Sequence, residues 1–270
     1  LALSSMVRNV HAFANSKKSY FMTDPDSRLA VQRLALVTGG VRGIGKAICV
    51  ALAAAGYRVV ANYAGSDELA RQLTAETGIR AYKFDVSDFD AVQAGIQEIE
   101  REHGPIEVLV NNAGITRDTT LHKMDVEQWR DVIRTDLGAC FNTCRNVIEG
   151  MRERRYGRII NIGSLNGQAG EYGQVNYCAA KSGIHGFNKA LALESAKFGI
   201  TVNAIAPGAI ETEMLMAVPE HVLQKICAKI PVGRFGRPEE IGRAVVFLAA
   251  EEASFITGLT LSINGGQHMY

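Results

Sequence analysis

Short apolar runs that recur along the chain constrain its fold more than any other feature. Each run is rich in Val, Ile, Leu and Ala, and stretches with helical start and stop signals separate one run from the next. Fully apolar runs of this length suit strands that are covered on both faces of a sheet. The predicted strands are Leu34–Val37, Arg58–Asn62, Arg80–Phe84, Ile106–Val110, Arg158–Ile162, Ile200–Ala206 and Leu259–Ile263.

Strands and helices that alternate six or seven times predict right-handed βαβ crossovers. We therefore expect an α/β fold of the Rossmann type, with a doubly wound parallel sheet of about seven strands and helices on both faces. No composition break divides residues 33–270, so they are predicted to form a single domain. Ser87 followed by Asp90 resembles a capping box ahead of the third helix. Residues 209–230 fit no strand and predict a helical insertion, where a substrate lid would sit.

The charge balance excludes some classes of protein. The 270 residues carry 29 Lys+Arg against 28 Asp+Glu, and this net charge of +1 argues against a nucleic-acid binder. No apolar run approaches the roughly 18–20 residues of a membrane span, so no membrane partner is expected. The five cysteines form no CxxC pair and the six histidines are scattered, which predicts reduced thiols and no metal site.

The first residues differ in composition from the rest. Residues 1–23 hold three basic side chains and no acidic one. This composition is typical of an organelle transit peptide, or of an extension ahead of a natural start near Met22. We favour the second interpretation, so 1–32 is expected to be a poorly structured extension and the protein to be cytoplasmic.

A glycine-rich segment follows the first predicted strand directly. Glycines at 39, 43 and 45 permit a tight turn and let backbone N–H groups at the start of a helix approach a pyrophosphate. Their order is GxxxGxG instead of the GxGxxG dinucleotide fingerprint, and a structural turn is the alternative for such a loop. Its position between a strand and a helix favours a nucleotide site. The residues expected to contact the cofactor here are Thr38, Gly39, Gly40, Arg42, Gly43, Ile44 and Gly45.

The end of the second predicted strand favours NADPH over NADH. An NAD site needs a carboxylate there to bind the ribose hydroxyls. This strand ends at Asn62, and the next acid, Asp67, is expected to lie in the following helix. Arg42 is placed to meet a 2′-phosphate, although an exposed loop arginine is otherwise commonplace.

Later strand ends add further candidates. Asp85 is expected either to bind the adenine amino group or to cap a helix. Small residues after the fourth strand let the backbone approach the cofactor. The additional cofactor candidates are Asn62, Asp85, Val86, Asn112, Ala113 and Gly114.

Three residues form a candidate catalytic set. Ser164 lies at the carboxyl end of the fifth predicted strand, two residues after Ile162. Tyr177 and Lys181 lie four apart in a helix, so they share one face. A nearby ammonium favours the phenolate form of a tyrosine and makes it a usable acid–base group. Tyr177 would then protonate a ketone oxygen while hydride arrives from nicotinamide, and Ser164 would hold that oxygen by a hydrogen bond.

With the glycine loop and the Asn111–Gly114 segment, this set resembles the short-chain dehydrogenase/reductase family over nearly the whole chain from Arg33. The resemblance implies that Tyr177 and Lys181 also contact the cofactor. It further implies that Pro207, Gly208, Ile210 and Thr212 meet its nicotinamide end.

Asp136 departs from the family pattern, which usually has an asparagine there that supports a water-mediated proton relay to the lysine. A carboxylate can accept from water or from Lys181 but lacks the amide donor. The catalytic set is therefore Ser164, Tyr177, Lys181 and Asp136, and it stays open whether Asp136 serves the relay or is simply tolerated.

The ending Asn264-Gly265-Gly266-Gln267-His268-Met269 and the segment Gly173–Tyr177 are similar to family members that reduce acetoacetyl-CoA to (R)-3-hydroxybutyryl-CoA for polyhydroxyalkanoate synthesis. The resemblance implies this NADPH-dependent activity on an acyl thioester, and a homotetramer. Reduction of 3-oxoacyl-acyl-carrier protein in fatty-acid synthesis is the alternative. A catalytically silent dinucleotide-binding sensor or scaffold is the alternative from another class, and the intact catalytic set argues against it. Asn166, Tyr172 and Gln174 are candidates for substrate contact or ordinary loop residues.

Overall fold

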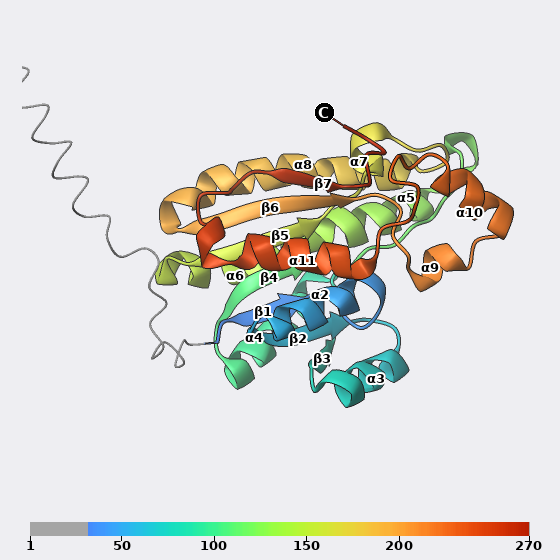
Figure 1. The fold of residues 1–270 in the computed structure, drawn as a ribbon. Helices are drawn as coiled ribbons and strands as arrows, with labels where there is room; N and C mark the ends of the chain where they lie inside the picture. Colours follow the sequence, from blue (N-terminus) through green and yellow to red (C-terminus); the bar gives the residue numbers. More distant parts are fainter. Residues whose placement is uncertain (1–31, 270) are drawn as a thin grey trace, which may run out of the picture. The chain divides into compact units, whose positions relative to one another are not determined.

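Strands and helices alternate along the chain in the computed structural model, which describes residues 32–269 (Figure 1). Each predicted strand is present, with bounds that differ by one residue at most. The strands are β1 (Leu34–Val37), β2 (Arg58–Tyr63), β3 (Arg80–Lys83), β4 (Ile106–Asn111), β5 (Gly157–Ile162), β6 (Ile200–Pro207) and β7 (Thr260–Ile263). The longer helices are α2 (Gly43–Ala54), α3 (Asp67–Thr77), α4 (Phe89–His103), α5 (Val126–Val132), α6 (Ala139–Arg154), α8 (Val175–Ser195), α10 (Glu220–Cys227) and α11 (Pro238–Ala249).

The strands form one parallel sheet in the order β3-β2-β1-β4-β5-β6-β7. The chain moves from β1 outward to β3, then crosses back so that β4 pairs with the other side of β1. The switch point therefore lies between β1 and β4, where ligands bind in open α/β sheets. The predicted Rossmann-type fold is confirmed.

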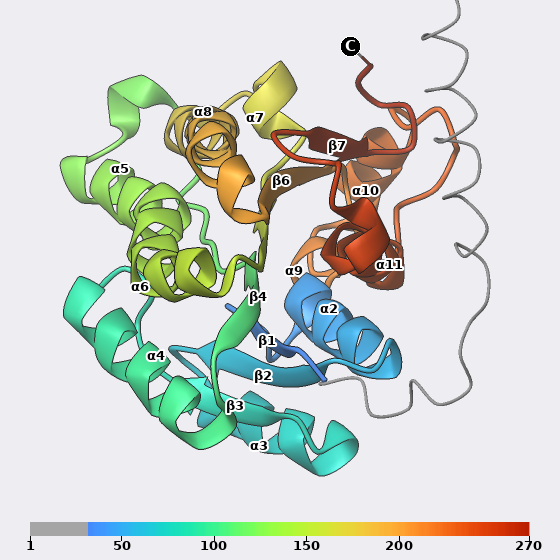
Figure 2. The ribbon, with the colours of Figure 1, turned by 90° about the vertical axis from the view of Figure 1, so that its left-hand side faces the viewer.

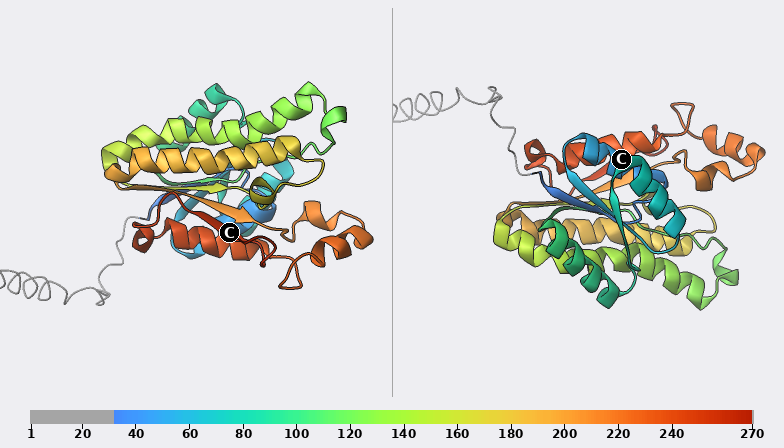
Figure 3. Two further views of the ribbon diagram at one scale, coloured as in Figure 1. Left: turned by 90° about the horizontal axis from the view of Figure 1, so that it is seen from above. Right: turned by 90° about the horizontal axis from the view of Figure 1, so that it is seen from below.

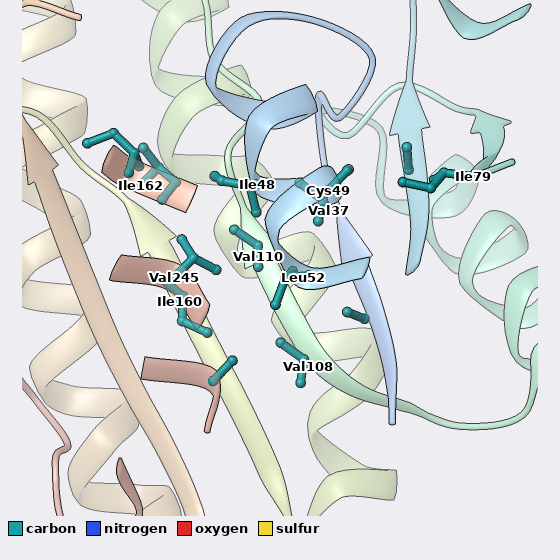
Figure 4. Close-up of a cluster of buried hydrophobic side chains, with 14 of the residues drawn as sticks. Val37, Ile48, Cys49, Leu52, Ile79, Val108, Val110, Ile160, Ile162 and Val245 are labelled. Carbon is teal, nitrogen blue, oxygen red and sulfur yellow. The ribbon is translucent and has the colours of Figure 1, made fainter. Parts of the chain in front are cut away.

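Helices cover both faces of this sheet. The helices α2, α3 and α11 pack on one face, and α4, α6 and α8 pack on the other (Figures 2 and 3). Successive side chains of β1 alternate between the two layers, with Ala35 and Val37 in one core and Leu34 and Leu36 in the other. Figure 4 shows the first core, where Val37 lies near Ile48 and Leu52 of α2. Both faces are apolar because both are covered.

The start of α4 differs from the sequence-based expectation. The N-cap residue is Asp88, whose side chain accepts a hydrogen bond from the Ala91 backbone N–H at 3.0 Å. The capping box predicted from Ser87 and Asp90 is therefore wrong by one residue. Asp and Ser are equally good N-caps, and the sequence pattern alone does not choose between neighbouring ones.

The segment 209–230 contains two short helices, α9 (Glu213–Met216) and α10, at the right-hand end of the view in Figure 1. Its beginning is tied to the residues that follow it. The Glu211 N–H donates to the Gly236 carbonyl at 2.8 Å, and the Gly236 N–H donates to the Ala209 carbonyl at 3.0 Å. The role of this segment as a lid stays a prediction, and the expected extension over 1–32 lies outside the described residues except for Gln32.

Candidate active site

The glycine loop joins β1 to α2 at the switch point. Gly39 has φ +61° and Gly43 has φ +52°, a backbone region that favours glycine. A Cβ on Gly45 would lie 2.2 Å from the Gly39 carbonyl oxygen, so the first turn of α2 touches the loop backbone. Arg42, the N-cap residue, makes no side-chain capping bond. The first N–H groups of α2 therefore stay available for an anion.

Two side chains hold this loop against β4. Thr38 Oγ1 accepts from the Asn112 and Ala113 backbone N–H groups at 3.0 and 3.1 Å. The Asn112 side-chain amide donates to the Thr38 and Gly39 carbonyls at 2.9 and 3.2 Å. The carboxyl ends of β1 and β4 are thus fixed to each other, which fixes the width of the switch-point crevice.

The end of β2 carries Asn62 in a bonded, buried position. Its side chain donates to the Phe84 carbonyl at 2.8 Å and accepts from the Gly39 N–H at 3.4 Å, so it joins β2 to β3 and to the glycine loop. Asp67 lies in the first turn of α3, as expected, and pairs with Lys83 at 2.8 Å. Asp85 accepts from the Ser87 N–H at 2.8 Å and so closes a turn between β3 and α4.

Ser164, Tyr177 and Lys181 line the same pocket as the glycine loop. Ser164 lies two residues after the end of β5, and its Oγ accepts from the Asn166 N–H at 3.1 Å. Tyr177 and Lys181 lie one turn apart in α8, and the Lys181 Nζ is 5.5 Å from the centroid of the Tyr177 ring. Lys181 is buried and donates to the Ile162 carbonyl at 3.1 Å, so β5 positions its ammonium.

Asp136 lies in a π-helical turn, Ile133–Gly138, between α5 and α6. Its Oδ1 accepts from the Ile115 N–H at 2.8 Å, and its Oδ2 lies 3.2 Å from Lys181 Nζ, outside hydrogen-bond geometry. Burial raises the pKa of Asp136, while the Lys181 ammonium and the Ile115 N–H act in the opposite direction. Burial lowers the pKa of Lys181, but Asp136 and Tyr177 outweigh it, so the net shift is upward. The structure therefore pairs the carboxylate directly with the lysine.

One pocket of about 530 Å³ connects the glycine loop with this group, a volume within the range of small-molecule sites. Most of the predicted residues line it. They are Gly39, Arg42, Gly43, Ile44, Gly45, Asn62, Asp85, Val86, Asn112, Ala113, Gly114, Asp136, Ser164, Tyr177, Lys181, Pro207, Gly208, Ile210 and Thr212.

Thr38 and Gly40 do not line the pocket. Thr38 bonds to β4 as described, and a Cβ on Gly40 would lie 2.8 Å from the Ala61 Cβ, so Gly40 allows close packing behind the loop. Asn166, Tyr172 and Gln174 do not line it either. Tyr172 is 87% exposed, and the Asn166 amide donates to Gln174, whose own amide donates to Asp118 at 2.7 Å.

Sequence reasoning missed the neighbours of the strand ends. These residues carry no recognisable motif. Most of them lie one to seven residues after a predicted strand, Ile162 is the last residue of one, and Thr135 lies in the turn between α5 and α6, where position relative to the strands gave no signal. The missed residues are Val41, Tyr63, Ala64, Gly65, Ser66, Leu69, Ile115, Thr116, Thr135, Ile162, Gly163 and Glu213.

The pocket suits an extended dinucleotide. Its glycines leave room that a Cβ would fill, since a Cβ on Gly39 would lie 3.1 Å from the Ala113 Cα. No group of three or more His, Cys, Asp or Glu side chains suited to a metal ion occurs among residues 32–269. Within the same range, no helix has the length and apolar character to cross a membrane. A Rossmann-type sheet, a glycine loop at its switch point and a Ser/Tyr/Lys group in the same pocket together define a dinucleotide-dependent oxidoreductase.

Comparisons with known proteins agree with this class. A family model described as enoyl-(acyl carrier protein) reductase matches residues 39–268. The acetoacetyl-CoA reductase of Rhizobium meliloti (strain 1021) is 59% identical over 88% of this chain and 99% of its own length. That of Paracoccus denitrificans is 60% identical over 87% and 98%. The 3-oxoacyl-acyl-carrier-protein reductase of Escherichia coli (strain K12) is 45% identical over 88% and 98%.

The chain belongs to the short-chain dehydrogenase/reductase family. It is an oxidoreductase, and membership of this family implies a nicotinamide dinucleotide cofactor.

Proposed function

We propose that this protein reduces acetoacetyl-CoA to (R)-3-hydroxybutyryl-CoA with NADPH, a step of polyhydroxyalkanoate synthesis. The observation that carries the proposal is the joint placement of Ser164, Tyr177 and Lys181 on the wall of the pocket that begins at the glycine loop. Relatives 59–60% identical over 87–88% of the chain are acetoacetyl-CoA reductases, which supports this substrate.

The chemistry divides between the cofactor and the protein. Bound NADPH supplies the hydride. The Tyr177 hydroxyl donates the proton that the ketone oxygen gains, and Ser164 Oγ donates a hydrogen bond that holds this oxygen in line. The Lys181 ammonium, held by the Ile162 carbonyl, stabilises the negative charge left on Tyr177 and binds the nicotinamide ribose.

The end of β2 supports NADPH over NADH. Asn62 is engaged with Phe84 and Gly39, and Asp67 is engaged with Lys83 and Tyr63. Asn62 has no carboxylate, and the carboxylate of Asp67 is already bonded, so neither side chain offers a free carboxylate to the ribose hydroxyls. Arg42 lines the pocket at this end and supplies a cation for a 2′-phosphate.

The acyl thioester would lie near the loop between Ser164 and Tyr177. The hydrogen-bonded chain from Asn166 through Gln174 to Asp118 lies in this region and fixes the orientation of both amides. Gln174→Ala should raise the KM for acetoacetyl-CoA several-fold and leave the Kd for NADPH unchanged. Exposed Tyr172 would contact the substrate only at the mouth of the site.

A homotetramer is the proposed assembly, in the cytoplasm, with the helices around 125–150 and 174–198 at the interface. Exposed apolar side chains on these helices support it, among them Phe141 and Leu193, which are 54% and 83% exposed. Light scattering coupled to size-exclusion chromatography tests the assembly. A monomer at micromolar concentration would contradict it.

The decisive experiment compares acetoacetyl-CoA with acetoacetyl-acyl-carrier protein, each with NADPH and with NADH. We expect the highest kcat/KM for acetoacetyl-CoA with NADPH, and at least a 100-fold loss of kcat in Tyr177→Phe with cofactor binding retained. A strong preference for the carrier protein would identify the fatty-acid reductase instead. Cofactor binding without turnover of either thioester would identify a silent sensor.

A further inference from the structure

The ion pair of Asp136 and Lys181 is buried beside the proposed acid–base tyrosine. The two side chains are 0% and 5% exposed, and the charged atoms lie 3.2 Å apart. Each partner is held by a second, backbone contact. The Ile115 N–H donates to Asp136, and Lys181 donates to the Ile162 carbonyl. Four separate elements therefore hold the pair: β5, the segment after β4, the π-helical turn and α8.

The other titratable groups around Lys181 are neutral, so Asp136 provides the negative charge that faces it. Lys181 interacts with Asp136, Tyr177 and Cys140. Burial raises the pKa of the Cys140 thiol to about 12, so this thiol is neutral. His185, on the next turn of α8, has its pKa lowered by burial, Lys189 and Lys181, and is also neutral near pH 7. Asp136 is thus the counter-charge that Lys181 meets in the described structure.

A counter-charge changes what a lysine does to a neighbouring tyrosine. An isolated ammonium favours the phenolate, whereas a nearby carboxylate disfavours it. With the carboxylate 3.2 Å away, the pair acts on Tyr177 largely as a dipole, whose field is weaker than that of a full positive charge. An asparagine, which the family resemblance leads one to expect here, would keep a similar shape but leave the lysine charge uncompensated.

We propose that Asp136 is a positioning residue that fixes the Lys181 ammonium and offsets part of its charge at Tyr177, so that the Tyr177 hydroxyl keeps its proton to higher pH. This inference rests on the proposed role of Tyr177 as the proton donor. Under that role, Asp136 extends ketone reduction toward alkaline pH, because the donor must be protonated at the start of each turnover.

The test is an ultraviolet pH titration of tyrosinate in the protein without substrate or cofactor. Subtracting the curve of Tyr177→Phe from that of the parent isolates Tyr177, and the same subtraction is made in the Asp136→Asn background. We expect Asp136→Asn to lower the midpoint by about one pH unit. Trp129 fluorescence, recorded in parallel, shows over which pH range each variant stays folded. An unchanged or raised midpoint would overturn the proposal.

The pH profile of kcat for reduction provides the second readout. Its alkaline limb should move down by about one pH unit in Asp136→Asn. It should stay in place in the matched control Asp131→Asn, which removes a carboxylate from an exposed pair with Arg134 on the neighbouring helix. If Asp136→Asn does not fold, Asp136→Ser is titrated with the same two outcomes. The tyrosinate titration needs no turnover, so its result stands apart from any failure of acetoacetyl-CoA reduction.

Discussion

Replacement of Gly45 by alanine tests whether close packing at the switch point shapes the cofactor site. The new Cβ would lie 2.2 Å from the Gly39 carbonyl oxygen and 2.6 Å from the Asn112 side-chain amide. Carbon and carbonyl oxygen meet without repulsion at roughly 3.3 Å. The loop at Gly39 must therefore retreat by about 1 Å, and the bond from Asn112 to the Gly39 carbonyl is strained as it does so.

The expected loss is larger in cofactor binding than in stability. Alanine is favoured over glycine by up to ~1 kcal/mol inside a helix, while overpacking costs about 1–3 kcal/mol. The net loss in the free energy of unfolding is therefore roughly 0–2 kcal/mol. A misplacement of about 1 Å costs on the order of 100-fold in rate at a reacting centre. We expect a loss of the same order in the Kd for NADPH, which corresponds to about 3 kcal/mol.

The assay is a fluorescence titration of NADPH, combined with thermal unfolding of the same samples. Gly186→Ala is the matched control, because Gly186 is also helical and a Cβ there would meet nothing within 4 Å. This control should leave the Kd unchanged and raise Tm slightly. A Kd for Gly45→Ala within threefold of the parent would refute the reasoning, since the loop would then have absorbed the contact at no cost to binding.

Three further outcomes follow from single side chains. Arg42→Ala should raise the KM for NADPH about tenfold or more and leave that for NADH nearly unchanged; equal effects on both, in initial-rate assays, would contradict the 2′-phosphate contact. Burial, Lys189 and Lys181 lower the pKa of His185, so its contribution to stability is present above about pH 6.5 and is lost as the pH falls. His185→Gln should therefore flatten the decline of Tm between about pH 7 and 5, whereas the exposed control His122→Gln should keep the parental slope. Met151 of α6 is fully buried in the core. Met151→Ala should therefore lower the free energy of unfolding by about 2–5 kcal/mol in urea titrations. A loss below about 1 kcal/mol would show that neighbouring side chains fill the cavity left by the methionine.

The sheet could be predicted from the sequence because its strands are covered on both faces. In β1, all four residues are fully buried, so apolarity is continuous and marks the strand without ambiguity. Helix ends were less certain, as Asp88 shows, since neighbouring polar residues compete for one cap. The order of the strands in the sheet could not be predicted from these apolar runs, because a run carries no signal of which other run it pairs with.

The candidate site was predictable where chemistry leaves a spaced motif. The glycines and the pair Tyr177/Lys181 have fixed spacing along one chain segment, so they could be recognised together. Thr38 carries no such signal. Its place beside the glycines suggested a cofactor contact, but its hydroxyl joins β1 to β4, and a partner 74 residues away cannot be read from local sequence.

Asp136 shows why a departure from a family pattern needs coordinates to be interpreted. On the sequence, an aspartate in place of an asparagine is compatible with a relay group, a partner of Lys181 or a tolerated change of similar shape. The π-helical turn points the carboxylate at both the Ile115 N–H and the Lys181 ammonium, so the residue is part of a buried charge pair. Aspartate and asparagine have similar shapes but differ in charge at this position. Removing the Asp136 charge would leave the Lys181 ammonium buried and unpaired. The consequence falls on the neighbouring Tyr177, whose proton is the one that the proposed reaction transfers.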